Sequence, residues 1–534
     1  MKIRFLVAIL FLAFLNNSFP QDIHVQVDTN RIKTDVLFLA SDSLEGRKTG
    51  ERGNTIAAEY IKQRLKKYNL TPGFKNSYFQ NVPIHSSKAS NQSKMVIYTS
   101  KFAKKLNYGI DYLIDESGEQ TIIPKPYPLV FIGYGIDAPE FNYNDYRYLN
   151  VEGKIVVFIS GEPESNDSSY FNGKIPSLYS YPAVKHKIAV SKGARGSILI
   201  RLPNDRYLPP WESLRKEYTR DYMVLASSFI GNLNLIFTYY AARWLFADSD
   251  YNLKDIVELH KDDKMISFPL DAQISFKEKF KQKDFISHNV LGVIEGSGKN
   301  KDEFVLVTAH FDHLGIGEPI AGDSIYNGFL DNALGTSSVI EIARILNSSK
   351  NLINRSVLIM LVTGEEFGLL GSRYFLYNPP YNLSSIVANI NVDGIAVIDS
   401  FKSIVGIGAK YSTLGEILNK TVKRENLKIA GIPPEFRYWE SFHRSDQSAY
   451  AQAGIPSILI SEGLDYVHYS KQKGIKKYIE YIKYYHTPFD GIHLKINYSA
   501  VKQNVSFLTK YIIDVANSKS RPQWYPNSVY YKSK

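Results

Sequence analysis

Five side chains of the types that bind zinc occur in the second half of the chain, mostly where predicted strands end. They are two imidazoles and three carboxylates, namely His310, Asp331, Glu366, Asp393 and His486. Zinc takes nitrogen and oxygen ligands in roughly tetrahedral sets, and a catalytic ion keeps one position open for water. Two ions could share this set if one carboxylate bridged them. The residue types therefore predict a two-metal centre that activates water and polarises a scissile carbonyl group.

Several of these residues have simpler interpretations when each is taken alone. Asp331 precedes a predicted helix, where an aspartate commonly accepts hydrogen bonds from the first backbone N–H groups. His486 stands before a turn and could be an ordinary surface histidine or one with its hydrogen bonds satisfied. Glu365 and Glu366 could occupy a solvated turn, although an apolar strand runs directly into them. The predicted metal centre depends on the whole set and on no single residue.

A hydrolase of this design also needs a base that contacts the water without serving as a metal ligand. Neighbouring side chains diverge at the end of a strand. One member of the pair Glu365 and Glu366 could therefore reach a metal ion and the other the water. The proton taken from the water could then pass to the leaving amine.

The predicted elements explain how residues so distant in the sequence could meet. Strand-length apolar runs at 304–309, 357–362 and 387–392 lead into His310, the Glu365–Glu366 pair and Asp393. They alternate with helical patterns such as 339–346, and this alternation predicts an α/β unit with a largely parallel sheet. Ligands bind outside the carboxyl ends of the strands in open α/β sheets. We therefore expect these side chains to converge at one edge of the sheet.

The order of these residues resembles that of the M28 family of zinc aminopeptidases. The motifs that carry the resemblance are His310-x-Asp312, Asp331-Asn332-x-x-Gly335, Gly364-Glu365-Glu366, Asp393 and His486-Thr-Pro-x-Asp490. Segments 44–50, 69–72, 444–446 and 453–456 are also similar to segments of these enzymes. The resemblance covers most of the chain after the N-terminal segment. It implies hydrolysis of the N-terminal peptide bond of peptides through a hydroxide that bridges two zinc ions.

The resemblance assigns the metal ligands individually. One zinc ion would take His310, Asp331 and Asp393. The second would take Asp331, Glu366 and His486, so that Asp331 would bridge the two ions.

It also implies roles for residues around the metals. Glu365 would be the general base, Asp312 would fix the tautomer of the first histidine, and Asp490 would have a similar or capping role. Relatives commonly carry a tyrosine shortly before the Ser-Asp pair at 445–446, where its hydroxyl can stabilise the oxyanion. This chain has Phe442 and His443 there, which makes His443 the candidate donor.

The chain divides into five predicted regions. Residues 1–20 have a signal-peptide pattern, because Lys2 and Arg4 precede an apolar run that is too short to cross a membrane. Residues 21–126 and 266–517 would form the peptidase domain, an α/β zinc-peptidase sandwich whose mostly parallel sheet is flanked by helices. Residues 127–265 resemble an inserted, mostly β protease-associated domain that would act as a lid or exosite. Residues 518–534 form a polar tail, expected to be a loose surface segment.

Composition limits the other classes of function. The 534 residues carry a net charge of +11, but the basic residues are spread along the chain and do not form the clusters that nucleic-acid binding requires. The absence of cysteine excludes disulfides and a thiol nucleophile. No apolar run after the N-terminal segment is long enough for a transmembrane helix. We expect a secreted or periplasmic protein whose partners are peptides with a free N-terminus.

Three alternatives share the fold implied by the resemblance. A related carboxypeptidase would need cationic groups over the substrate carboxylate, and no such cluster is evident in the sequence. A glutaminyl cyclase keeps a single zinc ion and carries out an intramolecular transfer. A binding protein without catalysis typically loses ligands or the base. All five candidate ligands and Glu365 are present, which argues against a binding protein. The inserted domain and the N-terminal segment 44–50 favour the aminopeptidase over the other two enzymes.

Overall fold

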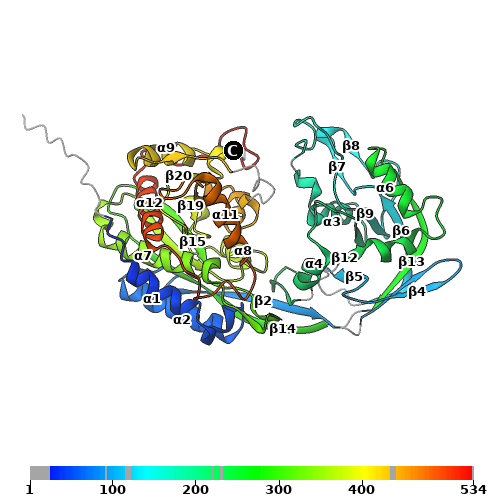
Figure 1. The fold of residues 1–534 in the computed structure, drawn as a ribbon, viewed down its shortest axis with the longest axis horizontal. Helices are drawn as coiled ribbons and strands as arrows, with labels where there is room; N and C mark the ends of the chain where they lie inside the picture. Colours follow the sequence, from blue (N-terminus) through cyan, green and yellow to red (C-terminus); the bar gives the residue numbers. More distant parts are fainter. Residues whose placement is uncertain are drawn as a thin grey trace, which may run out of the picture.

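The computed structural model describes residues 25–90, 93–114, 122–174, 176–218, 220–228, 232–277, 280–432 and 441–531. The predicted signal peptide at residues 1–20 lies outside the described residues, so secretion stays a prediction. Figure 1 shows two lobes that are connected by the long strands β2 (Phe79–Ala89) and β14 (Phe280–Ile294). No helix within these ranges is long and apolar enough to cross a membrane.

The larger lobe is built on a ten-stranded sheet with the order β11-β2-β14-β18-β15-β19-β22-β20-β21, and β1 pairs with β14 beside this path. The strands not yet defined are β1 (Thr71–Pro72), β11 (Tyr222–Leu225), β15 (Phe304–His310), β18 (Ser356–Val362), β19 (Ile386–Asn391), β20 (Ser403–Ile407), β21 (Lys428–Ile429) and β22 (Ser457–Glu462). β18, β15, β19 and β22 run parallel to one another, whereas β14 and β20 flank this group with antiparallel pairing. The four central strands are parallel as predicted, whereas the sheet as a whole is mixed.

Helices cover both faces of the sheet because its central strands are apolar along their length. Every residue of β18 is buried. In β15, Val305 and Val307 pack with α7 (Leu334–Ser348), whereas Leu306 packs with α8 (Leu370–Tyr377). The layer of α7 also contains α1 (Thr29–Leu39), α2 (Arg52–Lys67), α9 (Leu414–Arg424) and α12 (Tyr498–Ala516), and the layer of α8 contains α10 (Gln447–Gln452). Burial on both faces is typical of a sheet between two helical layers.

The smaller lobe contains an eight-stranded sheet with the order β4-β3-β13-β6-β9-β10-β12-β5. Its strands are β3 (Lys94–Tyr98), β4 (Ala103–Leu106), β5 (Tyr112–Ile114), β6 (Ile122–Ile132), β9 (Ile155–Ile159), β10 (Gly196–Arg201), β12 (Leu233–Thr238) and β13 (Ser267–Lys277). Its helices are α3 (Pro182–Ser191), α4 (Trp211–Tyr218), α5 (Tyr239–Ala242) and α6 (Leu253–Lys261). The lobe therefore mixes strands with helices around two apolar clusters, one containing Phe131 and the other Val130.

The structure corrects the limits that the sequence predicts for the inserted domain. β3, β4 and β5 precede residue 127 and β13 follows residue 265, yet all four pair into the smaller sheet. In the other direction, β11 lies between the predicted limits but pairs with β2 of the larger sheet. The composition change near residue 127 is a local signal. The pairing of Ser267 with Ile132 joins segments that are far apart in the chain, and no local pattern reports it.

The C-terminal segment is also more ordered than its polar composition predicts. Trp524 and Tyr530 are buried against Phe442 in a small apolar cluster. The Trp524 indole donates a hydrogen bond to the Gly454 carbonyl oxygen at 2.9 Å. The expectation of a loose surface segment is wrong for residues 518–531, because these aromatic side chains bury apolar area against the larger lobe.

Candidate active site

The five predicted ligands converge at the carboxyl ends of the parallel strands. His310 is the last residue of β15, and Glu366 and Asp393 follow β18 and β19. Asp331 lies in the helical turn η5 (Phe329–Ala333) that leads into α7, and His486 follows α11 (Lys471–Ile482). The polar atoms of His310, Asp331 and Asp393 form one group, and those of Asp331, Glu366 and His486 form a second with His313; within each group they lie within 4.8 Å of one another.

Asp331 is the residue that the two groups share. One of its oxygens, Oδ1, lies 3.2 Å from His310 Nε2, and the other, Oδ2, lies 3.3 Å from His486 Nε2. His310 Nε2 is also 3.3 Å from Asp393 Oδ1, and His486 Nε2 is 3.0 Å from Glu366 Oε2. Burial acts to raise the pKa of Asp331, but the two imidazoles outweigh it and hold that pKa well below its ordinary value. A carboxylate whose oxygens face two separate groups can bridge two cations.

The side chains fit divalent cations in both donor type and charge. His486 Nε2 is buried and makes no hydrogen bond of good geometry, although carboxylate oxygens surround it. In the part of the chain that the structure describes, no lysine or arginine forms an ion pair with Asp331, Glu366 or Asp393. Buried carboxylates without a cationic partner are costly, and imidazole nitrogen with carboxylate oxygen is a donor set that zinc prefers.

Glu365 lies beside these groups without a strong partner for its own carboxylate. It is only 9% exposed, and its polar atoms approach those of His310 and Glu366 within 4.8 Å. Burial, together with the neighbouring carboxylates, raises the pKa of Glu365 well above its ordinary value even though His310 acts against this. A carboxylate with a raised pKa can accept and return a proton near neutral pH.

Asp312 contacts His310 through a different atom from the one that the sequence predicts. The hydrogen bond at Nδ1 of His310 involves the main-chain oxygen of Asp312 at 3.2 Å, whereas the Asp312 carboxylate is 4.0 Å from Nδ1. That carboxylate accepts hydrogen bonds from Thr49 Oγ1 at 3.1 Å and from the Glu365 backbone N–H at 3.2 Å. Asp312 thus positions both the histidine and the predicted base.

Asp490 holds the loop that carries the shared carboxylate. Its Oδ1 accepts a hydrogen bond from the Leu330 backbone N–H at 2.8 Å, and its Oδ2 accepts one from the Asp331 backbone N–H at 3.0 Å. This geometry corresponds to the capping role among those expected for Asp490.

His443 is not brought into the cluster with the other predicted residues. It ends the helical turn η10 (Ser441–His443), and its Nδ1 lies 3.2 Å from the hydroxyl of Tyr530. Neighbouring Phe442 is buried with Tyr530 and Trp524, and this packing draws the segment toward the C-terminal cluster. The role of His443 as an oxyanion donor stays a prediction.

Three buried residues that the sequence did not single out support the site. His313 Nδ1 lies 2.6 Å from Glu366 Oε1, and Thr49 binds Asp312. Arg47 is fully buried and donates to the main-chain oxygens of Phe311, Leu39, Asn327 and Gly328. Arg47 and Thr49 belong to the 44–50 motif. The motif therefore indicated that these residues matter, but it did not indicate which groups they contact.

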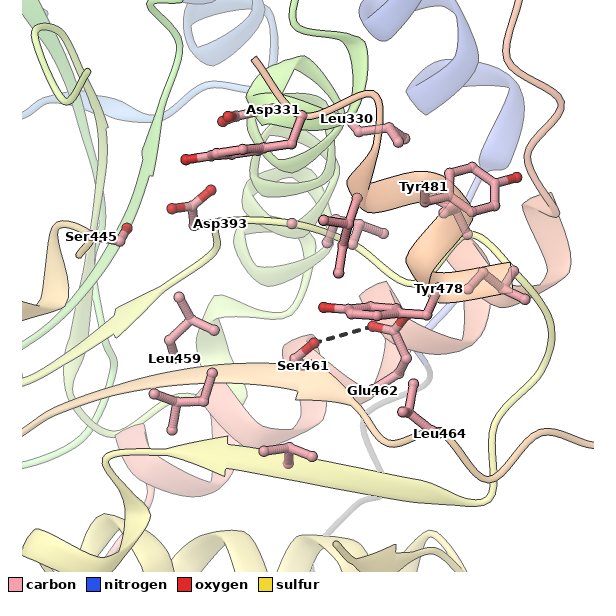
Figure 2. Close-up of a pocket in the computed structure, with 18 of the residues that line it drawn as sticks. Leu330, Asp331, Asp393, Ser445, Leu459, Ser461, Glu462, Leu464, Tyr478 and Tyr481 are labelled. Carbon is pink, nitrogen blue, oxygen red and sulfur yellow. Dashed lines mark hydrogen bonds between the residues drawn. The ribbon is translucent and has the colours of Figure 1, made fainter. Parts of the chain in front are cut away.

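A pocket of about 360 Å³ lies beside the shared carboxylate (Figure 2). Asp331 and Asp393 line one side, and Glu462 and Leu464 line the other. Much of the wall between them is apolar and includes Ile395, Val397, Ile398, Val405 and Leu459. Tyr485, which stacks on His486 at 3.8 Å between ring centroids, is also part of the wall. The site can therefore accept an apolar or amphipathic group next to the metal-type side chains.

Comparison with known proteins identifies the family. The model of "Peptidase family M28" matches residues 289–512, which contain all five predicted ligands and Glu365. Over these residues the chain matches peptidase family M28. The predicted family is confirmed, and so is its mixed α/β fold.

Similar M28-type proteins include fungal and bacterial enzymes. The chain is 26% identical over 234 residues to a probable leucine aminopeptidase 2 of Arthroderma benhamiae, covering 42% of this chain and 44% of that protein. It is 23% identical over 248 residues to the aminopeptidase YwaD of Bacillus subtilis, covering 44% and 46%. The chain thus spans less than half the length of these curated relatives.

The fold has a similar solved structure over nearly its whole length. An aminopeptidase from Aneurinibacillus sp. strain AM-1 superposes with a TM-score of 0.53 at 16% identity, covering 91% of this chain and 93% of that one. At this identity the likeness concerns the fold alone. It covers most of this chain, including much of the smaller lobe.

Proposed function

We propose that this protein is a zinc-dependent aminopeptidase that removes N-terminal residues from peptides. The single observation that carries the proposal is Asp331, whose two oxygens face two separate groups of imidazole and carboxylate side chains. The two relatives described above are named aminopeptidases, which supports the same activity for this chain.

Two zinc ions would be held by the predicted sets. His310, Asp331 and Asp393 would hold one ion, and Asp331, Glu366 and His486 would hold the other. When bound, the ions would polarise the scissile carbonyl and lower the pKa of the attacking water. His313 would orient Glu366 through its hydrogen bond of 2.6 Å, as groups behind metal ligands commonly do.

Glu365 would transfer the proton. Its carboxylate would accept a proton from the attacking water and return it to the leaving amine. The backbone N–H of Glu365 is held by Asp312, and Asp312 also contacts His310, so base and ligand are positioned by one residue. Burial of Glu365 keeps bulk water away from the proton that it carries.

The charge of the pocket favours an aminopeptidase over a carboxypeptidase. Among the described residues, four carboxylates line it, namely Asp331, Asp393, Asp490 and Glu462, against one cationic side chain, Arg444. Bound zinc ions would offset the charges of Asp331 and Asp393, so Glu462 and Asp490 would be the carboxylates that attract a free cationic amine and repel a free C-terminal carboxylate.

The test is metal analysis of the purified protein coupled to a panel of aminoacyl reporter substrates. We expect about two zinc ions per chain and turnover that falls to background when a chelator removes them. Activity should return when zinc is added back. Full turnover by protein whose metal has been removed would overturn the proposal, and so would bound zinc without hydrolysis of any aminoacyl substrate.

We further propose that the smaller lobe is a protease-associated domain that restricts access to the site. It approaches the larger lobe beside the hairpin of β16 (Gly315–Ile320) and β17 (Asp323–Tyr326). There Arg215 of α4 lies 3.5 Å from Glu318, which stands between His310 and Asp331 in the sequence. Asp221, where the chain passes from α4 to β11 of the larger sheet, forms an ion pair with Lys48 beside this contact.

Replacing Asp221 by Ala should loosen this contact. The ratio of kcat/KM for long peptides to that for aminoacyl reporters should change by about two- to fivefold, since partly exposed ion pairs contribute little energy. Steady-state kinetics on peptides of two and ten residues would measure it. Asp302→Ala, at an exposed turn before β15, is the matched control. An equal effect of Asp221→Ala on all lengths would argue against a restricting lobe.

A further inference from the structure

The pocket beside Asp331 carries an isolated acidic group at the side away from the metal-type residues. Glu462 is the last residue of β22 and lines the pocket opposite Asp331 and Asp393 (Figure 2). Glu462 is only 9% exposed. Aliphatic side chains make up much of the remaining lining, together with the tyrosines Tyr478, Tyr481 and Tyr485, so Glu462 shares a largely apolar pocket with the metal-type carboxylates.

Glu462 has no cationic partner within the described ranges. Its one hydrogen bond from another side chain comes from the Ser461 hydroxyl, at 3.2 Å, and no described lysine, arginine or histidine forms an ion pair with it. Burial raises the pKa of Glu462, as expected for a carboxylate that lacks a compensating charge. Burying such a group is unfavourable unless a partner reaches it. A pocket that opens onto the group allows the partner to be a ligand.

We propose that this pocket selects substrates whose N-terminal residue is lysine or arginine, with Glu462 binding the charged end of that side chain. The inference rests on the proposed function, because that function places the scissile bond and the free amine beside Asp331 and Asp393. The aliphatic stem of lysine or arginine packs against apolar walls such as Val405 and Leu459, and its head reaches Glu462. A charge-assisted hydrogen bond there satisfies the buried carboxylate.

Other side chains match the pocket less well. Leucine fills part of the apolar wall but leaves Glu462 buried without a partner. Aspartate and glutamate would place a negative charge near Glu462, and Arg444 is the one cationic side chain among the described residues that line the pocket. Norleucine is the informative comparison, because it has the four-carbon stem of lysine without the amine.

The experiment compares kcat/KM of the full-length zinc enzyme for lysyl, arginyl, norleucyl and leucyl p-nitroanilides. We expect the wild type to prefer lysyl over norleucyl by about tenfold or more, which is the range of one hydrogen bond to a charged group. Glu462→Gln keeps the shape but removes the charge. It should lower kcat/KM for lysyl and arginyl substrates by about 10- to 100-fold and leave norleucyl within about threefold. The control Glu480→Gln makes the same charge change on α11, at an exposed position that does not line the pocket.

A binding measurement tests the same pocket without turnover. Titration calorimetry with free lysine and free norleucine should show tighter binding of lysine to the wild type, and Glu462→Gln should abolish that preference. Equal affinities for the two amino acids, or equal losses for lysyl and norleucyl substrates in the variant, would overturn the inference. Failure of the proposed function would give a different result. The protein would then turn over no aminoacyl substrate but would still bind lysine more tightly than norleucine in calorimetry.

Discussion

Glu365→Gln should lower kcat by about 10²- to 10⁴-fold, the range that a positioned general base contributes. The amide has nearly the same size as the carboxylate but cannot accept the proton of the attacking water. Glu365 belongs to neither of the two proposed ligand sets, so the variant should keep its zinc. The backbone N–H that binds Asp312 is unchanged, which preserves the local fold.

Two measurements separate loss of the base from loss of the metal. Zinc content by mass spectrometry should equal that of the wild type, while kcat on an aminoacyl reporter falls. The matched control is Glu366→Gln at the next residue, which we expect to lose both zinc and activity because Glu366 is a proposed ligand. A Glu365→Gln protein that turns over at more than about a tenth of the wild-type rate would show that another group accepts the proton.

Arg47→Met should lower the free energy of unfolding by about 3–5 kcal/mol, as expected when the charged partner of several buried acceptors is removed. The Arg47 guanidinium is fully buried and donates to four main-chain oxygens, including those of Phe311 and Gly328. Methionine fills a similar volume but donates no hydrogen bond, so these oxygens would be left without a donor. Because Phe311 follows His310 and Gly328 precedes η5, zinc affinity should fall as well.

Urea denaturation followed by circular dichroism would measure the stability change, and zinc titration against a chelating dye would measure the affinity. Arg31→Met is the matched control. Arg31 forms a surface ion pair with Asp28 at 3.0 Å, and its loss should cost about 0.5 kcal/mol or less. A cost below about 1 kcal/mol for Arg47→Met would mean that the structure satisfies these carbonyl oxygens in another way.

Some of the smaller lobe and of the C-terminal segment could not be predicted from local patterns. The strands β3, β4, β5 and β13 lie outside the predicted limits of the insertion. Which strands share a sheet depends on pairing between segments far apart in the chain, such as β13 with β6. The burial of Trp524 and Tyr530 against Phe442 has the same origin, and so does the contact of Tyr530 with His443.

The sequence by itself determined the residue types of the site and the edge at which they meet. His310, Glu366 and Asp393 follow apolar runs whose length and alternation with helices require parallel strands, and parallel strands end at one edge. Only the tertiary structure decided which polar atoms meet. Asp331 faces both His310 and His486, Asp312 binds His310 through its main chain, and Glu462 lines the pocket. Periodicity and residue type are local properties, whereas these contacts depend on packing between elements that are distant in the chain.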